Sequence, residues 1–233
     1  MTDYDVPLIG TVETQYYTAE ETLTFELPPE ALPGDFLMIH ASYKIGFSPS
    51  IIDPSWSKDS FSGIRDMNGG IFYRFLGENE GPSVTIQFER GHRASGLLTV
   101  WRNVDPEEPI HSEWSWSHEG VRGQVTHQLH ELQSAAQLTR PCKMVYIRSV
   151  HHSPHPRLAM RGGEGFEYLG AWGMTLDGRW YTYGNSVHRN GVTSEPGGGE
   201  PPSALSGENG WLAYEEMSSL CATVALSALP VAE

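Results

Sequence analysis

Apolar and polar residues alternate along much of the chain with a period of two. The clearest case is residues 83–89, in which Val84, Ile86 and Phe88 alternate with polar residues, and a similar run covers residues 71–76 just before it. Because successive side chains of a β-strand point to opposite faces, this pattern predicts strands with one buried face.

Two pairs of these runs are close enough in sequence to form hairpins. The stretch between residues 71–76 and 83–89 is rich in turn-forming residues, which predicts a hairpin or a meander. Asp177-Gly178 separates residues 173–176 from residues 180–183. An Asp-Gly pair between two strands is a strong signal for a two-residue hairpin.

Further strands are predicted where β-branched and aromatic residues are concentrated. They cover residues 22–27, 35–43, 96–104, 143–150, 211–214 and 220–229. Helical signals are sparse. Residues 127–138 place Leu129, Leu132 and Ala136 at helical spacing after Thr126, but the same residues also fit a strand followed by a loop.

The order of these elements predicts one all-β domain over residues 1–233. Each half of the chain has apolar strands, a middle rich in Trp and Gly, and an apolar closing strand. This order suits two packed antiparallel sheets in a jelly-roll-like β-sandwich. Long loops are predicted at residues 48–68, 104–123 and 189–207, and the last contains a Gly- and Pro-rich insertion at 190–206.

The net charge narrows the list of partners. The chain has 29 acidic and 15 basic residues, which give a formal charge of -14 at pH 7. Such a surface repels a phosphate backbone, so nucleic-acid binding is not expected. The most apolar stretch, residues 220–232, is too short to cross a bilayer, and the first residues lack the features of a signal peptide. We expect a protein made in soluble form in the cytoplasm.

The chain contains two cysteines, Cys142 and Cys221. Two distant cysteines form neither a disulfide framework nor a zinc motif, and we expect both to be buried in strands. Whether they pair depends on whether their strands are neighbours, which the sequence leaves open.

Five stretches of the chain follow one another in an order found in a known family. They read PGDFLMI (33–39), IFYRF (71–75), EGPSVTI (80–86), LTVWRNVDP (98–106) and CATVAL (221–226). Together they resemble a β-sandwich family common in tailed phages and prophages, over roughly residues 23–229. The chain departs from the family pattern where Asn103 replaces a glycine, where no glycine precedes Trp56, and where residues 190–206 form an addition.

The resemblance implies a place in a phage particle, because members of this family are usually virion proteins encoded among tail genes. It implies no catalytic residues. We therefore expect a structural protein of the tail or fibre that contacts other virion proteins and contributes to adhesion to the host surface. Such proteins commonly form cyclic homo-oligomers, and we expect a homotrimer. A capsid decoration or head-spike protein is one alternative, and a glycan-active hydrolase of the virion is another.

Three histidines are weak candidates for a metal site. His151, His152 and His155 lie close together, and imidazole is a common metal ligand. However, adjacent residues of a strand point to opposite faces, and no nearby cysteine completes a ligand set. A structural or surface role is therefore favoured, and no cofactor is expected.

Motifs for nucleophilic catalysis, metalloproteases and phosphate loops are absent from the sequence. The acid pairs Glu107-Glu108 and Glu215-Glu216 keep the hydrolase alternative open, because glycoside hydrolysis needs two carboxylates across a sugar. Adjacent acids on a strand diverge, however, and we expect that the chain is not an enzyme.

Aromatic residues are the candidate ligand-binding groups. Trp114, Trp116, Tyr181 and Tyr183 lie among polar residues, and exposed rings of this kind stack on sugars. Burial in the core or against a neighbouring subunit is the alternative. Burial in the core is expected for three tryptophans of the predicted strands, Trp101, Trp172 and Trp211.

Overall fold

The computed structural model describes a chain built from β-strands. It covers residues 3–15, 20–44, 52–62, 67–92, 94–111, 115–122, 138–151, 165–176, 179–195 and 216–231. No helix occurs in these ranges, and so none of them contains a helix that could span a membrane. The strands are β1 (Leu8–Gln15), β2 (Glu20–Glu26), β3 (Phe36–Lys44), β4 (Ser57–Ser62), β5 (Met67–Phe75), β6 (Ser83–His92), β7 (Ala94–Trp101), β8 (Ser115–Arg122), β9 (Cys142–His151), β10 (Phe166–Leu176), β11 (Arg179–Arg189) and β12 (Glu216–Ser227).

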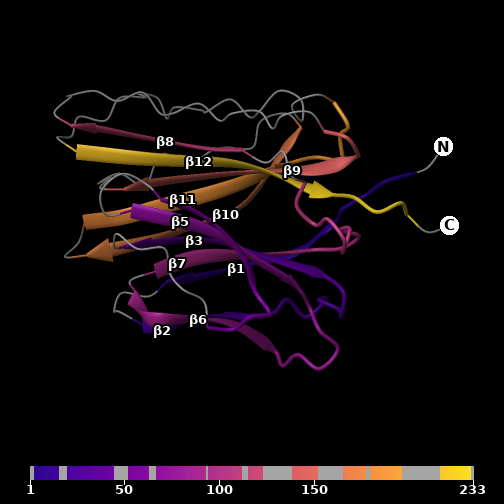
Figure 1. The fold of residues 1–233 in the computed structure, drawn as a ribbon, viewed down its shortest axis with the longest axis horizontal. Helices are drawn as coiled ribbons and strands as arrows, with labels where there is room; N and C mark the ends of the chain where they lie inside the picture. The colour runs from indigo at the N-terminus through magenta and orange to yellow at the C-terminus, as the bar shows by residue number, and fades with distance from the viewer. Residues whose placement is uncertain are drawn as a thin grey trace.

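The strands form three antiparallel sheets that are stacked in layers (Figure 1). The first sheet has the order β1-β7-β3-β5-β4, and the second sheet has the order β10-β11-β9-β12-β8. β2 and β6 pair separately as a two-stranded ribbon. Figure 1 shows the first sheet between the second sheet and the ribbon. The predicted all-β sandwich is confirmed, and the ribbon adds a third layer to it.

Both faces of the first sheet are covered. On β3, Phe36 and Met38 belong to the apolar cluster shared with the second sheet, whereas Leu37 and Ile39 belong to the cluster shared with the ribbon. All 8 residues of β7 are buried. A strand that is buried on both faces needs apolar or small residues at every position, which explains why alternation weakens along β7.

Two tryptophans fill the interface between the first and second sheets. Trp101 and Trp172 are both buried in it, as predicted for strand tryptophans, and Trp211 lies outside the described residues. Gly184 on β11 faces Trp172 on β10. A Cβ atom at Gly184 would lie 2.2 Å from the indole, so only glycine leaves room for the ring.

On one side of the sandwich, a hydrogen bond joins the outer strand of the first sheet to the outer strand of the second sheet. β1 is an outer strand of the first sheet, and β10 is an outer strand of the second. Glu13 Oε1 accepts a hydrogen bond of 2.9 Å from the Ala171 N–H. This contact satisfies a backbone donor on an edge strand, where unpaired donors otherwise favour pairing with other chains.

The N- and C-terminal segments lie side by side at one end of the sandwich, which we call the terminal end (Figure 1). Tyr4 and Pro230 form a β-bridge, and the Val231 N–H donates a hydrogen bond of 2.9 Å to Asp3 O. Val6 is fully buried in the core between the two five-stranded sheets. The N-terminal segment therefore covers this end of the interface.

The hairpin predicted from the alternating runs on β5 and β6 is wrong. β5 belongs to the first sheet and β6 to the ribbon. The Leu76 N–H donates to Asp35 O at 2.8 Å, whereas Pro82 O accepts from the Leu27 N–H at 2.8 Å. The link between Leu76 and Pro82 therefore crosses from one layer to another. Alternation identifies strands, but their pairing depends on contacts between residues far apart in sequence.

Two predicted loops contain strands. β4 lies within residues 48–68 and β8 within residues 104–123, and both are outer strands of their sheets. β1 was not predicted either. The hairpin at Asp177-Gly178 is supported by the pairing of Leu176 with Arg179. Three predictions fall outside the described residues: residues 127–137 of the alternative helix at 127–138, the strand at 211–214, and residues 196–206 of the insertion.

Replacing Gly184 with alanine tests the packing of Trp172. We expect Gly184→Ala to lower the free energy of unfolding by about 1–3 kcal/mol, the usual cost of overpacking a core. Urea unfolding measures the change. Gly81→Ala is the control, because a Cβ there meets nothing within 4 Å. Equal effects of the two substitutions would contradict the close contact between Gly184 and Trp172.

Candidate functional site

The predicted ligand-binding aromatics have their backbones on the second sheet, in two separate places. Trp116 lies on the outer strand β8, whereas Tyr181 and Tyr183 lie near the start of β11. Trp116 and Tyr183 are three strands apart and three positions apart in the register, which corresponds to about 17 Å between their backbones. These positions therefore do not form one continuous patch, and Trp114 lies outside the described residues.

His151 ends β9, with its backbone opposite Thr182 on one side and Ser218 on the other. This places its backbone beside the two tyrosines of β11. His152 and His155 lie outside the described residues. Among the residues that the structure describes, no group of three or more His, Cys, Asp or Glu side chains could hold a metal ion. The structural or surface role expected for these histidines stays a prediction.

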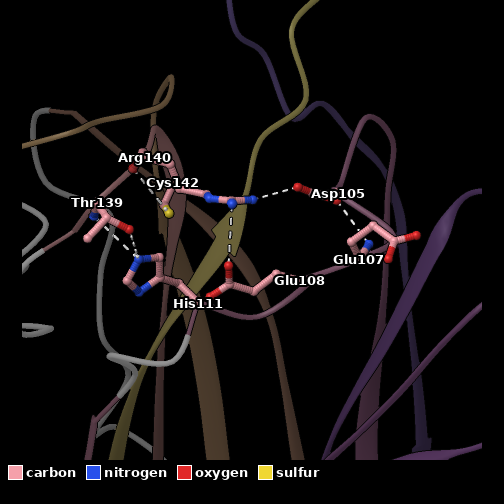
Figure 2. A network of polar contacts seen from close by, with 7 residues as sticks. All are labelled: Asp105, Glu107, Glu108, His111, Thr139, Arg140 and Cys142. Carbon is pink, nitrogen blue, oxygen red and sulfur yellow. Dashed lines mark hydrogen bonds and ion pairs between the residues drawn. The ribbon is translucent and has the colours of Figure 1, made fainter.

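A polar network fixes the connection between the first and second sheets (Figure 2). This connection, the crossover, consists of residues 102–111, and backbone hydrogen bonds join it to β12. Arg140 lies between two carboxylates of the crossover, with Nη1 2.5 Å from Asp105 Oδ2 and Nη2 3.4 Å from Glu108 Oε2. The network therefore ties the crossover to the residues that lead into β9.

His111 anchors the same region from the end of the crossover (Figure 2). Its Nε2 lies 2.9 Å from Thr139 Oγ1 and accepts the Thr139 N–H at 3.3 Å. A hydroxyl beside an imidazole nitrogen resembles a nucleophile and its base. Here the same nitrogen lone pair also holds the backbone amide of Thr139. The contact therefore fixes the chain before β9.

A second contact holds the start of the crossover. Arg102 donates through Nε and Nη2 to the two carboxylate oxygens of Asp35, at 2.8 and 2.9 Å. Asp35 is only 2% exposed, so this bidentate pair compensates its buried charge. The next residue, Asn103, has a φ of 62°, in the left-handed region that favours glycine and that Asn tolerates.

Cys142 is a free, buried cysteine. Burial raises the pKa of its thiol to about 11, so the thiol is protonated and weakly nucleophilic at neutral pH. In the register of β9 and β12, Cys142 faces Ser227 and Cys221 faces Arg148, which corresponds to about 20 Å between the two cysteines along the strands. A disulfide needs Cα atoms within about 7 Å. The register therefore excludes the Cys142–Cys221 pairing that the sequence left open.

The acid pair Glu107-Glu108 has diverging side chains. Glu108 is ion-paired in the network, and the Glu107 carboxylate points the other way (Figure 2). Asp53 and Glu80 have lowered pKa values, because a backbone amide and a guanidinium donate hydrogen bonds to them. The general acid of a glycoside hydrolase needs a raised pKa. Asp53 and Glu80 therefore lack the raised pKa of a general acid. Glu215 lies outside the described residues.

A buried polar cluster between the two five-stranded sheets was missed by the sequence analysis. Ser42 Oγ lies 2.9 Å from Ser149 Oγ and accepts the Trp172 Nε1–H at 2.8 Å. His40, which points the same way from β3, packs edge-on against the Trp172 ring, with 5.9 Å between ring centroids. Neither ring nitrogen of His40 has a hydrogen-bond partner among the residues that the structure describes. The sequence feature that could have revealed this cluster is the alternation of residues 36–42, which places two polar residues, His40 and Ser42, on an apolar face.

The burial of His40 predicts a loss of stability in acid. Burial lowers its pKa from 6.5 to about 3. The unfolded chain therefore binds the proton first, and stability falls as the pH drops from 6.5 toward 3. Between pH 6.5 and pH 4, this proton uptake should lower the free energy of unfolding by about 3 kcal/mol. We expect His40→Leu to abolish this loss, because leucine has no group that titrates.

Urea unfolding of the two proteins across this pH range measures the effect of His40. Unfolding at pH 8 is the control, because His40 is neutral in both states there and the difference reports packing alone. Identical slopes of the free energy of unfolding against pH for the two proteins would show that His40 is not the cause of the loss of stability in acid.

The structure is an all-β sandwich that a two-stranded ribbon covers on one face. The polar sites that the structure describes are the ion pairs and hydrogen bonds at the crossover and the cluster buried between the two five-stranded sheets. Comparison of the chain with protein-family models, with curated proteins and with solved structures finds no match.

Proposed function

We propose that this chain is a structural component of a tailed-phage particle, associated with the tail or a fibre, and that it contributes to adhesion to the host surface. The proposal rests on the resemblance of its sequence motifs to a β-sandwich family of tailed phages. The five motifs fall on β3, β5, β6, β7 with the crossover, and β12. These strands contribute buried residues to all three layers.

The observation that best supports the proposal is the geometry of the fourth motif, at residues 98–106. Asn103 adopts the left-handed conformation at the position where the family has glycine. The preceding Arg102 binds Asp35 of the first motif through two hydrogen bonds. Two motifs that are far apart in sequence are thus joined by a partly buried ion pair. Asn103 keeps the backbone conformation that glycine favours at this position.

A role in recognition follows from what a rigid sandwich can present. The sheets are fixed by two apolar interfaces, so loops and strand ends can hold a recognition surface without losing the core. Tyr181, Tyr183 and His151 have neighbouring backbones at one end of the second sheet. Aromatic rings in such a place would bind host glycans by stacking on sugar faces. No metal or cofactor is part of this proposal.

Imaging of phage particles tests the location. We expect gold-labelled antibodies against the purified chain to bind the tail or its fibres on particles released by the organism that encodes it. Particles labelled with pre-immune antibodies are the control. Label on the head would replace this proposal with a capsid decoration or head-spike role. Particles that carry no label would contradict any virion role and favour a test of the purified chain on host polysaccharides.

The purified chain should also form a homotrimer, because tail and fibre components usually assemble with cyclic symmetry. Size-exclusion chromatography with light scattering measures the mass, and a monomer at all concentrations would contradict the expected assembly.

A further inference from the structure

Asn-Gly pairs occur in the chain at residues 68–69, 190–191 and 209–210. The backbone nitrogen of the residue after an Asn can attack the side-chain amide of that Asn, and glycine allows the closest approach because it has no Cβ atom. Such a pair is therefore prone to lose ammonia. The structure places two of the pairs in opposite surroundings, whereas residues 209–210 lie outside its described part.

Asn68 and Gly69 lie inside β5, an inner strand of the first sheet. The backbone of Asn68 pairs with Tyr43 of β3 on one side and with Ser62 of β4 on the other. To form a ring with the next nitrogen, the backbone after Asn68 would have to rotate out of the extended conformation, which would break the pairing on both sides. This Asn-Gly pair is therefore protected in the folded chain.

Asn190 and Gly191 form an exposed bend directly after β11. Gly191 has a φ of 66°, in the left-handed region, and the Asn190 N–H donates to Gly165 O at 2.8 Å. Within the described part of the chain, neither the side-chain amide of Asn190 nor the N–H of Gly191 forms a hydrogen bond. The two groups that must react are therefore exposed to solvent and can approach each other without breaking a described contact.

The bend lies between two points at which the chain is anchored. Before the bend, Arg189 pairs with Phe166 of β10. After it, Thr193 and Cys142 exchange two backbone hydrogen bonds, of 2.8 and 2.9 Å, which join this segment to the start of β9. Arg189 Nη2 also lies 3.6 Å from Glu195 Oε2, so an ion pair spans the bend. A change in the length of the backbone at the bend therefore acts directly on the contact with β9.

We propose that Asn190 is a site of spontaneous deamidation, which converts the bend to isoaspartate and loosens the contact between Thr193 and β9. The Gly191 nitrogen loses its proton to solvent and forms a bond to Cγ of Asn190. The bond between Cγ and the side-chain nitrogen breaks, and that nitrogen takes a proton from solvent and leaves as ammonia. The product is a succinimide, and neither an oxidant nor a reductant is needed.

Water then opens the succinimide at one of its two carbonyl groups. Attack at one carbonyl gives aspartate, and attack at the other gives isoaspartate. In isoaspartate the main chain runs through Cβ and Cγ, so the bend between Arg189 and Thr193 gains one backbone atom. Both products add a negative charge near the ion pair of Arg189 with Glu195. This inference does not depend on the proposed virion role.

Peptide mass spectrometry of the full chain after incubation for weeks at pH 8 tests the site. We expect Asn190 to convert to acid at least about tenfold faster than Asn68, because β5 must open before Asn68 can react. The same incubation in guanidinium chloride is the control. In the unfolded chain the two sites should react at similar rates, because glycine follows both. Equal rates in the folded protein, or no reaction at Asn190 there, would overturn the proposal.

The variant Asn190→Gln tests the effect of the modification on β9. It keeps a side-chain amide at the bend but needs a larger ring to react, so we expect residue 190 to stay unmodified. Amide hydrogen exchange is followed by NMR before and after incubation of both proteins. The amides of Thr193 and Cys142 should exchange faster after incubation of the natural protein and at an unchanged rate in the variant. An equal change in both proteins, or no change in either, would overturn the link to β9.

Discussion

Burial of the first sheet on both of its faces is the constraint on which the rest of the structure depends. Its inner strands β3 and β7 supply apolar side chains to the second sheet on one face and to the ribbon on the other. Removal of apolar surface from water is the dominant favourable contribution to folding. The second sheet and the ribbon each lie against a different face of the first, so neither layer is positioned without it.

Polar groups in and around this core have separate roles. The Asp35–Arg102 pair and the Arg140 network hold the crossover where the chain passes from the first sheet to the second. Ser42, with its hydrogen bonds to Ser149 and Trp172, joins the two sheets within the core. These contacts specify how the layers meet, because a buried polar group without a partner is costly.

The sequence predicted strands well and their partners poorly. Alternation identified β6 correctly, but it gave no sign that β6 pairs with β2 in a separate layer and not with β5. Outer strands such as β8, which has a mixed polar sequence, carried little pattern. His40 and Ser42 were not singled out, because their contacts with Trp172 arise from the packing of two sheets that are far apart in sequence. By contrast, the buried Trp101 and Trp172 followed directly from their places in apolar strands.

Amide hydrogen exchange, followed residue by residue by NMR, tests most directly whether the doubly covered first sheet is the most stable part of the molecule. The rigid scaffold on which the proposed virion role rests depends on this property. We expect the amides of β3 and β7 to exchange only through global unfolding and those of the outer strands β4 and β8 to exchange faster. Exchange in β3 and β7 that is as fast as in the outer strands would contradict the central place of the first sheet.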